Sequence, residues 1–215
     1  MNPYLIFILT VLILKYLLNL TVSVLELRSL EPKLPQEFKD IYSQEKYQKS
    51  QEYTHVRDIF SRVYSTFWVI LTLIFILVGG FNLADLMARN FNLTPILTGL
   101  IFIGSLSFLS SLISLPFSIY STFVIEERFG FNKTTIKTFI LDMIKGTLLS
   151  IIIGAPLLSA VLWFFQTTGN LAWLYVWIAV TLFTFIIQFL SPVLIMPLFN
   201  KFTPLEEGEL KEIIT

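Results

Sequence analysis

The residue types that most often carry chemistry are scarce in this sequence. It contains one histidine, His55, and no cysteine, so disulfide bonds and thiolate metal sites are excluded. A zinc protease site of the H-E-x-x-H type needs two histidines one helical turn apart, with a glutamate between them as the base. His55 could in principle activate a serine, but nothing places one beside it, and we interpret it as an ordinary loop residue. The sequence also lacks a glycine-rich phosphate loop, so these residues alone predict no complete catalytic apparatus.

Two short polar segments that directly follow long apolar runs are instead the candidates for function. The first, residues 123–135, reads FVIEERFGFNKTT and combines two adjacent acids, an arginine and a Phe-Gly-Phe turn. We expect Asn132 or Thr134 to cap the helix that follows it. The second, residues 200–206, reads NKFTPLE and contains a capping box with Thr203 as the N-cap and Pro204 at the first helical position. This capping box predicts that a further helix begins over residues 203–215.

A third set of polar side chains lies inside the apolar runs themselves. Lys15 and Asn19 share one face of the first run, Ser111 and Ser118 share one face of the third, and Gln188 belongs to a polar stripe in the fifth. Small and hydroxyl residues can serve close helix packing, because they let backbones approach. An ionised lysine near the bilayer centre, however, costs at least about 2.5–3.5 kcal/mol without a partner or water. Dry packing and a water-filled interior are both open interpretations of these residues.

Composition identifies the elements that must position these side chains as membrane helices. The chain is 55% hydrophobic and only 14% charged, which leaves too few polar residues to cover a soluble core of this size. Its formal net charge is zero, so no overall field attracts nucleic acid. We therefore predict an integral membrane protein whose first partner is the lipid bilayer.

Five apolar runs are long enough to cross about 30 Å of hydrocarbon as helices. They are residues 3–25, 63–81, 95–125, 139–165 and 171–195. Pro116 predicts a kink and an extension past the bilayer in the third run. Residues 28–62 are predicted to be helical in large part, because Tyr53, Val56 and Phe60 follow helical spacing into the second run. The predicted fold class is all-α: a polytopic bundle of about five transmembrane helices over residues 1–202.

The distribution of basic residues predicts how the bundle is oriented. Twelve lysines and arginines lie in segments expected on one side of the membrane, and Arg89 alone lies in a segment expected on the other. The positive-inside rule then places the N-terminus outside and the C-terminus in the cytoplasm. The membrane could be a bacterial inner membrane or the endoplasmic reticulum.

Two long motifs carry a resemblance to a known family. The segments SLPFSIYSTFVIEERFGFNKTTIKTFILDMIKG and LSPVLIMPLFNKFTPLEEGELKEII resemble the N-terminal membrane half of the CAAX prenyl protease family, and YQKSQEYTHVRDIFSRVYS is similar to the same family. These proteases are intramembrane zinc metalloendopeptidases in which several spans enclose a water-filled chamber. The resemblance implies a membrane scaffold that admits prenylated or other membrane-borne peptides.

The resemblance also implies what must lie elsewhere. In the family, the H-E-x-x-H motif and a further glutamate ligand follow the PLFNKFTPL stretch, and this sequence ends before them. The resemblance thus implies zinc and a C-terminal catalytic domain, in the same chain or in a split partner, but no cofactor held by these residues. The residues expected to line the substrate chamber or to contact the catalytic domain are Glu126, Glu127, Arg128, Phe129, Gly130, Phe131, Asn132, Lys133, Asn200, Lys201, Phe202, Thr203 and Pro204.

Three alternatives compete with this interpretation. Both polar segments could simply anchor and cap helices at the membrane surface, as polar loop residues often do. The chain could instead be a small transporter or channel, although five spans do not divide into inverted repeats. It could also be a non-catalytic scaffold that binds a partner through its inner loops.

Overall fold

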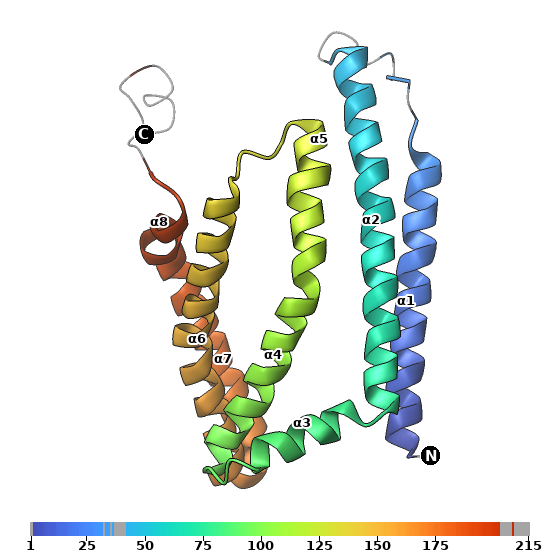
Figure 1. Cartoon of the computed structure of the whole chain (residues 1–215). Coiled ribbons are helices and arrows are strands. Elements are labelled where there is room, and N and C mark those ends of the chain that lie inside the picture. Colours follow the sequence, from blue (N-terminus) through green and yellow to red (C-terminus); the bar gives the residue numbers. More distant parts are fainter. Residues whose placement is uncertain (1, 32, 35, 37–41, 203–207, 209–215) are drawn as a thin grey trace. The chain divides into compact units, whose positions relative to one another are not determined.

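The structure is a computed structural model that describes residues 2–31, 33, 34, 36, 42–202 and 208 (Figure 1). All regular elements in these residues are helices, which confirms the predicted fold class. Five of the described helical stretches are long and apolar enough to cross a membrane. The chain divides into two compact units: Met1–Asn92 with Phe102–Thr134, and Leu93–Ile101 with Thr135–Thr215.

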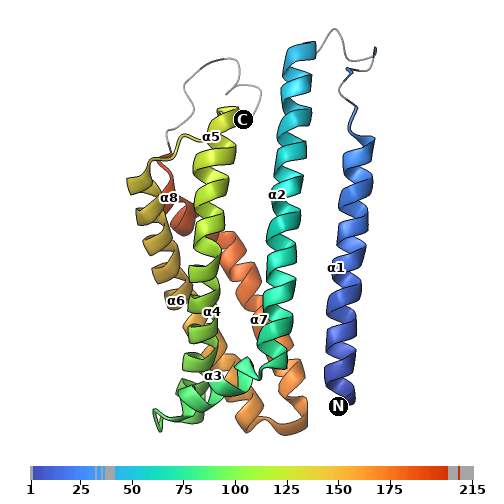
Figure 2. The ribbon, with the colours of Figure 1, turned by 45° about the vertical axis from the view of Figure 1, so that its right-hand side comes forward.

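The first unit begins with two long helices that lie side by side, α1 (Pro3–Ser29) and α2 (Gln44–Leu77) (Figures 1 and 2). Each has a side-chain cap at its start, because the Asn2 side chain accepts a hydrogen bond from the Tyr4 amide and Ser43 accepts one from the Lys46 amide. α2 is one continuous helix that contains both the polar sequence before residue 63 and the apolar run after it. It ends at Leu77, before the predicted Phe81, because Gly79 adopts a left-handed conformation with φ 74°.

A short helix, α3 (Gly80–Arg89), follows directly and runs crosswise to α2 in both views (Figures 1 and 2). Its position is fixed by contact with the end of α2. The rings of Phe75 and Phe81 meet edge to face with centroids 4.9 Å apart, and Gly80 lies directly beneath the Phe75 ring.

The third predicted span is longer than expected and changes its helical geometry. α4 (Pro95–Tyr120) contains Pro116, as predicted, and continues through the π-helix η2 (Ser121–Glu126) into the single turn α5 (Glu127–Phe129). Gly130 ends this stretch in the left-handed conformation, with φ 78°. π-helical turns are rare and often occur at functional sites.

The second unit is built on a hairpin of two long helices, α6 (Ile136–Thr167) and α7 (Ala172–Leu190), joined by the 3₁₀ turn η3 (Gly169–Leu171). The first residues of α4 pack closely against this hairpin, because a side chain at Gly99 would meet the Leu162 side chain. α7 continues into a second π-helix, η4 (Ser191–Ile195), and the short α8 (Met196–Phe199). Pro192 lies within η4 and has no amide hydrogen for the bond to the Gln188 carbonyl that an α-helix would require.

One local expectation needs correction, because the cap of α6 is Thr135 and not Asn132 or Thr134. The Thr135 hydroxyl accepts a hydrogen bond from the Thr138 amide at 3.2 Å. The predicted helix before the second span is present from Gln44 onward, as part of α2. Residues 37–41 of that prediction lie outside the described residues.

Candidate functional site

The first polar segment forms a compact turn at the end of the third span. The main-chain carbonyl of Glu126 accepts hydrogen bonds from the amides of Phe131 and Asn132, at 2.9 and 3.2 Å. The amide of Gly130 donates to the Glu127 carbonyl at 3.0 Å, and this closure requires the positive φ of Gly130. The Phe-Gly-Phe sequence therefore reverses the chain directly after α5.

Glu126 is held by the polar part of α2. The Tyr53 hydroxyl donates a hydrogen bond to the Glu126 carboxylate at 2.7 Å, and Arg57 donates to the Tyr53 hydroxyl at 3.4 Å. Glu126 and Tyr53 are 73 residues apart in sequence, so this bond fixes the π-helix against α2. A hydrogen bond to an ionised group contributes about 1.5–3 kcal/mol, more than one between neutral groups.

The two neighbouring charges have separate partners. Arg128 pairs with Glu52 of α2 at 2.6 Å, while Glu127 accepts a hydrogen bond from the Asn132 side chain at 2.9 Å. Both members of the Arg128–Glu52 pair are exposed, so water screens their attraction and it contributes little to stability. Asn132 also accepts from the Thr134 amide at 2.7 Å, which stabilises the turn.

Aromatic rings reinforce the same contact. Phe129 is only 4% exposed, and its ring meets the Tyr53 ring edge to face with centroids 5.2 Å apart. The Phe131 ring also meets the Tyr53 ring edge to face, with centroids 4.9 Å apart, but Phe131 is 58% exposed. We call Tyr53, Glu126, Phe129 and Phe131 the α2 anchor. Lys133 is exposed beside it.

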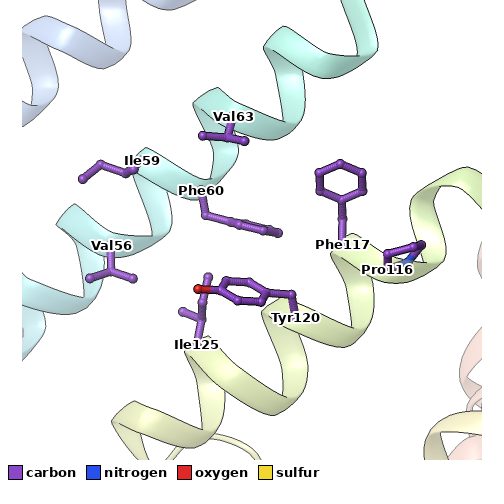
Figure 3. A pocket seen from close by; sticks show the side chains of 8 residues that line it. All are labelled: Val56, Ile59, Phe60, Val63, Pro116, Phe117, Tyr120 and Ile125. Atoms are coloured by element: carbon purple, nitrogen blue, oxygen red, sulfur yellow. The ribbon is translucent and has the colours of Figure 1, made fainter. Parts of the chain in front are cut away.

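A cavity of about 560 Å³ lies along the next turns of the same two elements (Figure 3). Its lining is apolar or aromatic and comes from Val56, Ile59, Phe60, Val63, Pro116, Phe117, Tyr120 and Ile125. The rings of Phe60 and Tyr120 project toward each other and stack with centroids 5.5 Å apart. Ile125, which is 3% exposed, precedes Glu126 in the chain, so the cavity adjoins the α2 anchor. Its size is within the range of small-molecule pockets, about 300–1,000 Å³.

The second polar segment leaves α8 beside a lysine of α6. The Lys145 ammonium donates to the Leu198 carbonyl at 3.0 Å, approaches Asp142 at 3.5 Å and lies 5.8 Å from the centre of the Phe199 ring. The Asn200 amide closes α8 by donating to the Met196 carbonyl at 3.0 Å. The side chains of Asn200, Lys201 and Phe202 are exposed, and Thr203 and Pro204 lie outside the described residues.

The polar residues predicted inside the membrane are not buried between helices. Lys15, Asn19, Ser111, Ser118 and Gln188 all have exposed side chains. Whether they face water or lipid stays a prediction. The described polar contacts between α1 and α2 use other residues: the Tyr16 and Thr66 hydroxyls meet at 2.8 Å, and Ser23 donates to Asp58 at 2.7 Å.

Sequence reasoning identified the first polar segment but not all of its partners. Tyr53 belongs to the helical stripe that the sequence predicts, whereas Glu52 and Arg57 lie outside that stripe and were not identified. Asp58, which pairs with Arg62 at 3.2 Å, was not identified either. Acids and bases alternate along this part of α2, and such alternation alone does not distinguish a solvated helix face from one that packs on a neighbour.

The described residues do not fit a metal centre. No group of three or more histidine, aspartate or glutamate side chains in that part of the chain is placed to bind an ion. Glu126 and Glu127 point their carboxylates at different donors, Tyr53 and Asn132.

Comparisons with known proteins give the site its context. A family model described as CAAX prenyl protease N-terminal, five membrane helices, matches residues 23–201. The CAAX prenyl protease 1 homolog of Oryza sativa subsp. japonica is 36% identical, over 99% of this chain and 52% of its own length. CAAX prenyl protease 1 of Saccharomyces cerevisiae is 38% identical, over 86% of this chain and 43% of its own length. The chain thus spans about half the length of the curated relatives it matches.

A solved structure agrees with these relatives. The crystal structure of S. mikatae Ste24p matches 100% of this chain and 52% of its own chain, with a TM-score of 0.90 and 35% sequence identity. The matched region contains both polar segments and all five candidate spans.

Proposed function

Because the chain belongs to the CAAX prenyl protease N-terminal family, we propose that it forms the substrate-access part of a zinc metalloendopeptidase that cleaves prenylated or other membrane-borne peptides. The observation that carries this proposal is the match to Ste24p along the whole chain at a TM-score of 0.90. A likeness of that extent supports a shared role for the membrane helices, and not only a shared helix type.

The cavity beside the α2 anchor supports the substrate class. A prenyl group is a long hydrocarbon chain, and burial of each CH₂ group gives about 0.8 kcal/mol. The aromatic and branched side chains of Phe60, Phe117 and Ile125 offer such a surface within one unit of the fold. The hydrogen-bonding groups of Tyr53 and Glu126 adjoin this cavity. In this proposal the polar peptide that carries the prenyl group lies beside them.

We further propose that the zinc ligands come from polypeptide outside these 215 residues, in the same chain or in a separate subunit. The relatives are about twice as long, and the described residues hold no set of metal ligands. In this proposal residues 1–202 are the membrane domain and residues 203–215 lead into the catalytic part. The distribution of lysine and arginine supports an N-terminus outside and a C-terminus in the cytoplasm, which impermeant labelling of an Asn132→Cys variant from each side of the membrane would test.

A chimera tests the main proposal. This chain would replace the matching N-terminal region of the S. cerevisiae CAAX prenyl protease 1, and the chimera would be purified in detergent and reconstituted. We expect it to cleave a farnesylated reporter peptide, to lose that activity with a metal chelator, and to cleave the unprenylated peptide much more slowly.

The control is a second chimera that carries the matching region of the Arabidopsis thaliana relative, which is 38% identical to this chain. If the control is active while the first chimera is folded and monodisperse but inactive, the proposed function is wrong. If both peptides are cleaved equally fast, the proposed preference for prenylated substrates is wrong, and the proposed role in a protease is retained.

A further inference from the structure

The short helix α3 has an apolar face whose side chains are exposed. Its sequence GFNLADLMAR places Leu83, Leu86 and Met87 on one side, and these side chains are 60%, 52% and 61% exposed. The buried side of the helix consists of small residues, with Gly80 and Ala88 buried. α3 therefore has one buried face of small residues and one exposed apolar face.

The remaining side of α3 is polar and carries no net charge. It presents Asn82, Asp85 and Arg89, and the Arg89 guanidinium donates to Asp85 at 2.7 Å one helical turn away. That hydrogen bond raises the pKa of Arg89 above its ordinary value. A short helix with one apolar and one polar side is typical of segments that lie in a membrane interface.

The neighbouring elements place α3 at the edge of the bilayer. The apolar run of α2 ends at Leu77, and the next helix able to span the membrane begins at Pro95. Leu77 and Val78, just before α3, are exposed and apolar. α3 runs crosswise to α2, so it lies along the membrane surface if α2 crosses the membrane (Figures 1 and 2). Gly80 and Phe81 at its start contact the Phe75 ring at the end of α2.

We propose that α3 is an interfacial membrane anchor, whose Leu83, Leu86 and Met87 side chains insert into lipid hydrocarbon at the face of the bilayer reached by the end of α2. This role does not depend on the protease proposal, because it requires only the bilayer and the described helix. It would hold the connection between the second and third spans at a constant depth in the membrane.

Site-directed fluorescence tests this anchor directly, since the chain has no native cysteine. The variants Leu83→Cys and Met87→Cys would each carry an environment-sensitive NBD label in the full chain, reconstituted in phosphatidylcholine vesicles. Asn82→Cys is the matched control, because it neighbours Leu83 but lies on the polar side. We expect blue-shifted emission and several-fold stronger quenching by doxyl-labelled lipid at positions 83 and 87, with stronger quenching by aqueous iodide at position 82.

Two results would overturn the proposal. Strong iodide quenching at positions 83 and 87 would place the apolar face in water. Protection from both quenchers would show that protein covers it, either another part of the chain or a second copy. Each labelled variant would be compared with the unlabelled chain by size-exclusion chromatography, and Leu86→Cys would be labelled in addition, so that a single misfolded variant does not decide the outcome.

Discussion

Two membrane-spanning stretches of this chain end in π-helical segments, η2 and η4, and the two ends are stabilised in different ways. Within and just after η2, the buried side chains of Ile125 and Phe129 and the Tyr53–Glu126 hydrogen bond attach the helix end to α2. Within and just after η4, the apolar side chains of Leu194 and Leu198 are exposed, and the Lys145 ammonium donates to the Leu198 carbonyl. The π-helix η2 thus has many side-chain contacts around it, whereas the π-helix η4 has few.

The difference shows which of the two helix ends is stabilised by side-chain contacts within its own unit. π-helical turns are rare and occur mostly as single turns within α-helices. The end of η2 has such contacts from α2. The end of η4 relies on one partly exposed cation, so we expect it to respond more to its surroundings than to core packing.

The largest expected effect comes from removing the buried ring of the α2 anchor. Phe129→Ala should lower the free energy of unfolding by about 3–5 kcal/mol, because a buried phenylalanine leaves a cavity when it is truncated. SDS titration of the chain in mixed micelles, followed by circular dichroism, would measure this loss. The matched control is Phe131→Ala, whose ring also contacts Tyr53 but is mostly exposed. If both variants lose the same free energy of unfolding, burial of the Phe129 ring does not explain the stability of the α2 anchor.

A double-mutant cycle sharpens the polar part of the same contact. Tyr53→Phe and Glu126→Ala should show a coupling energy of about 1.5–3 kcal/mol, the range for a hydrogen bond to an ionised group. The same unfolding measurement gives this value from the two single variants and the double variant. Glu127→Ala serves as the control partner for Tyr53→Phe, because Glu127 bonds to Asn132 and should add independently. A coupling near zero for Tyr53 and Glu126 would show that the aromatic rings alone hold η2.

The smallest effect is expected at the end of η4. Lys145→Met should cost about 1 kcal/mol, because the lost bond to the Leu198 carbonyl is partly exposed to solvent. Hydrogen exchange of the Asn200 amide, which closes α8, should become faster in this variant. Lys137→Met, at an exposed position of the same helix, should leave that exchange unchanged. If Lys145→Met also leaves it unchanged, the contact does not stabilise α8 and the contrast between the two ends is larger than we infer.

Much of the fold could be predicted because it depends on local composition. The five spans follow from runs of apolar residues longer than the bilayer requires, and the described residues contain five helices long and apolar enough to cross a membrane. Helix ends were less predictable. α2 stops at Leu77 because Gly79 turns the chain, and η2 and η4 replace α-helical turns that a sequence pattern cannot distinguish from them.

The sequence by itself determined that the chain is a bundle of membrane helices and that a short polar turn with Glu126 and Arg128 follows the third span, because hydropathy and turn chemistry act over a few residues. The tertiary structure alone decided that Glu126 binds Tyr53 and that Arg128 binds Glu52, more than seventy residues away. The same packing of α2 against the third span created the apolar cavity. The physical reason is that a carboxylate accepts any donor that reaches it, and only the register between helices decides which donor is within reach.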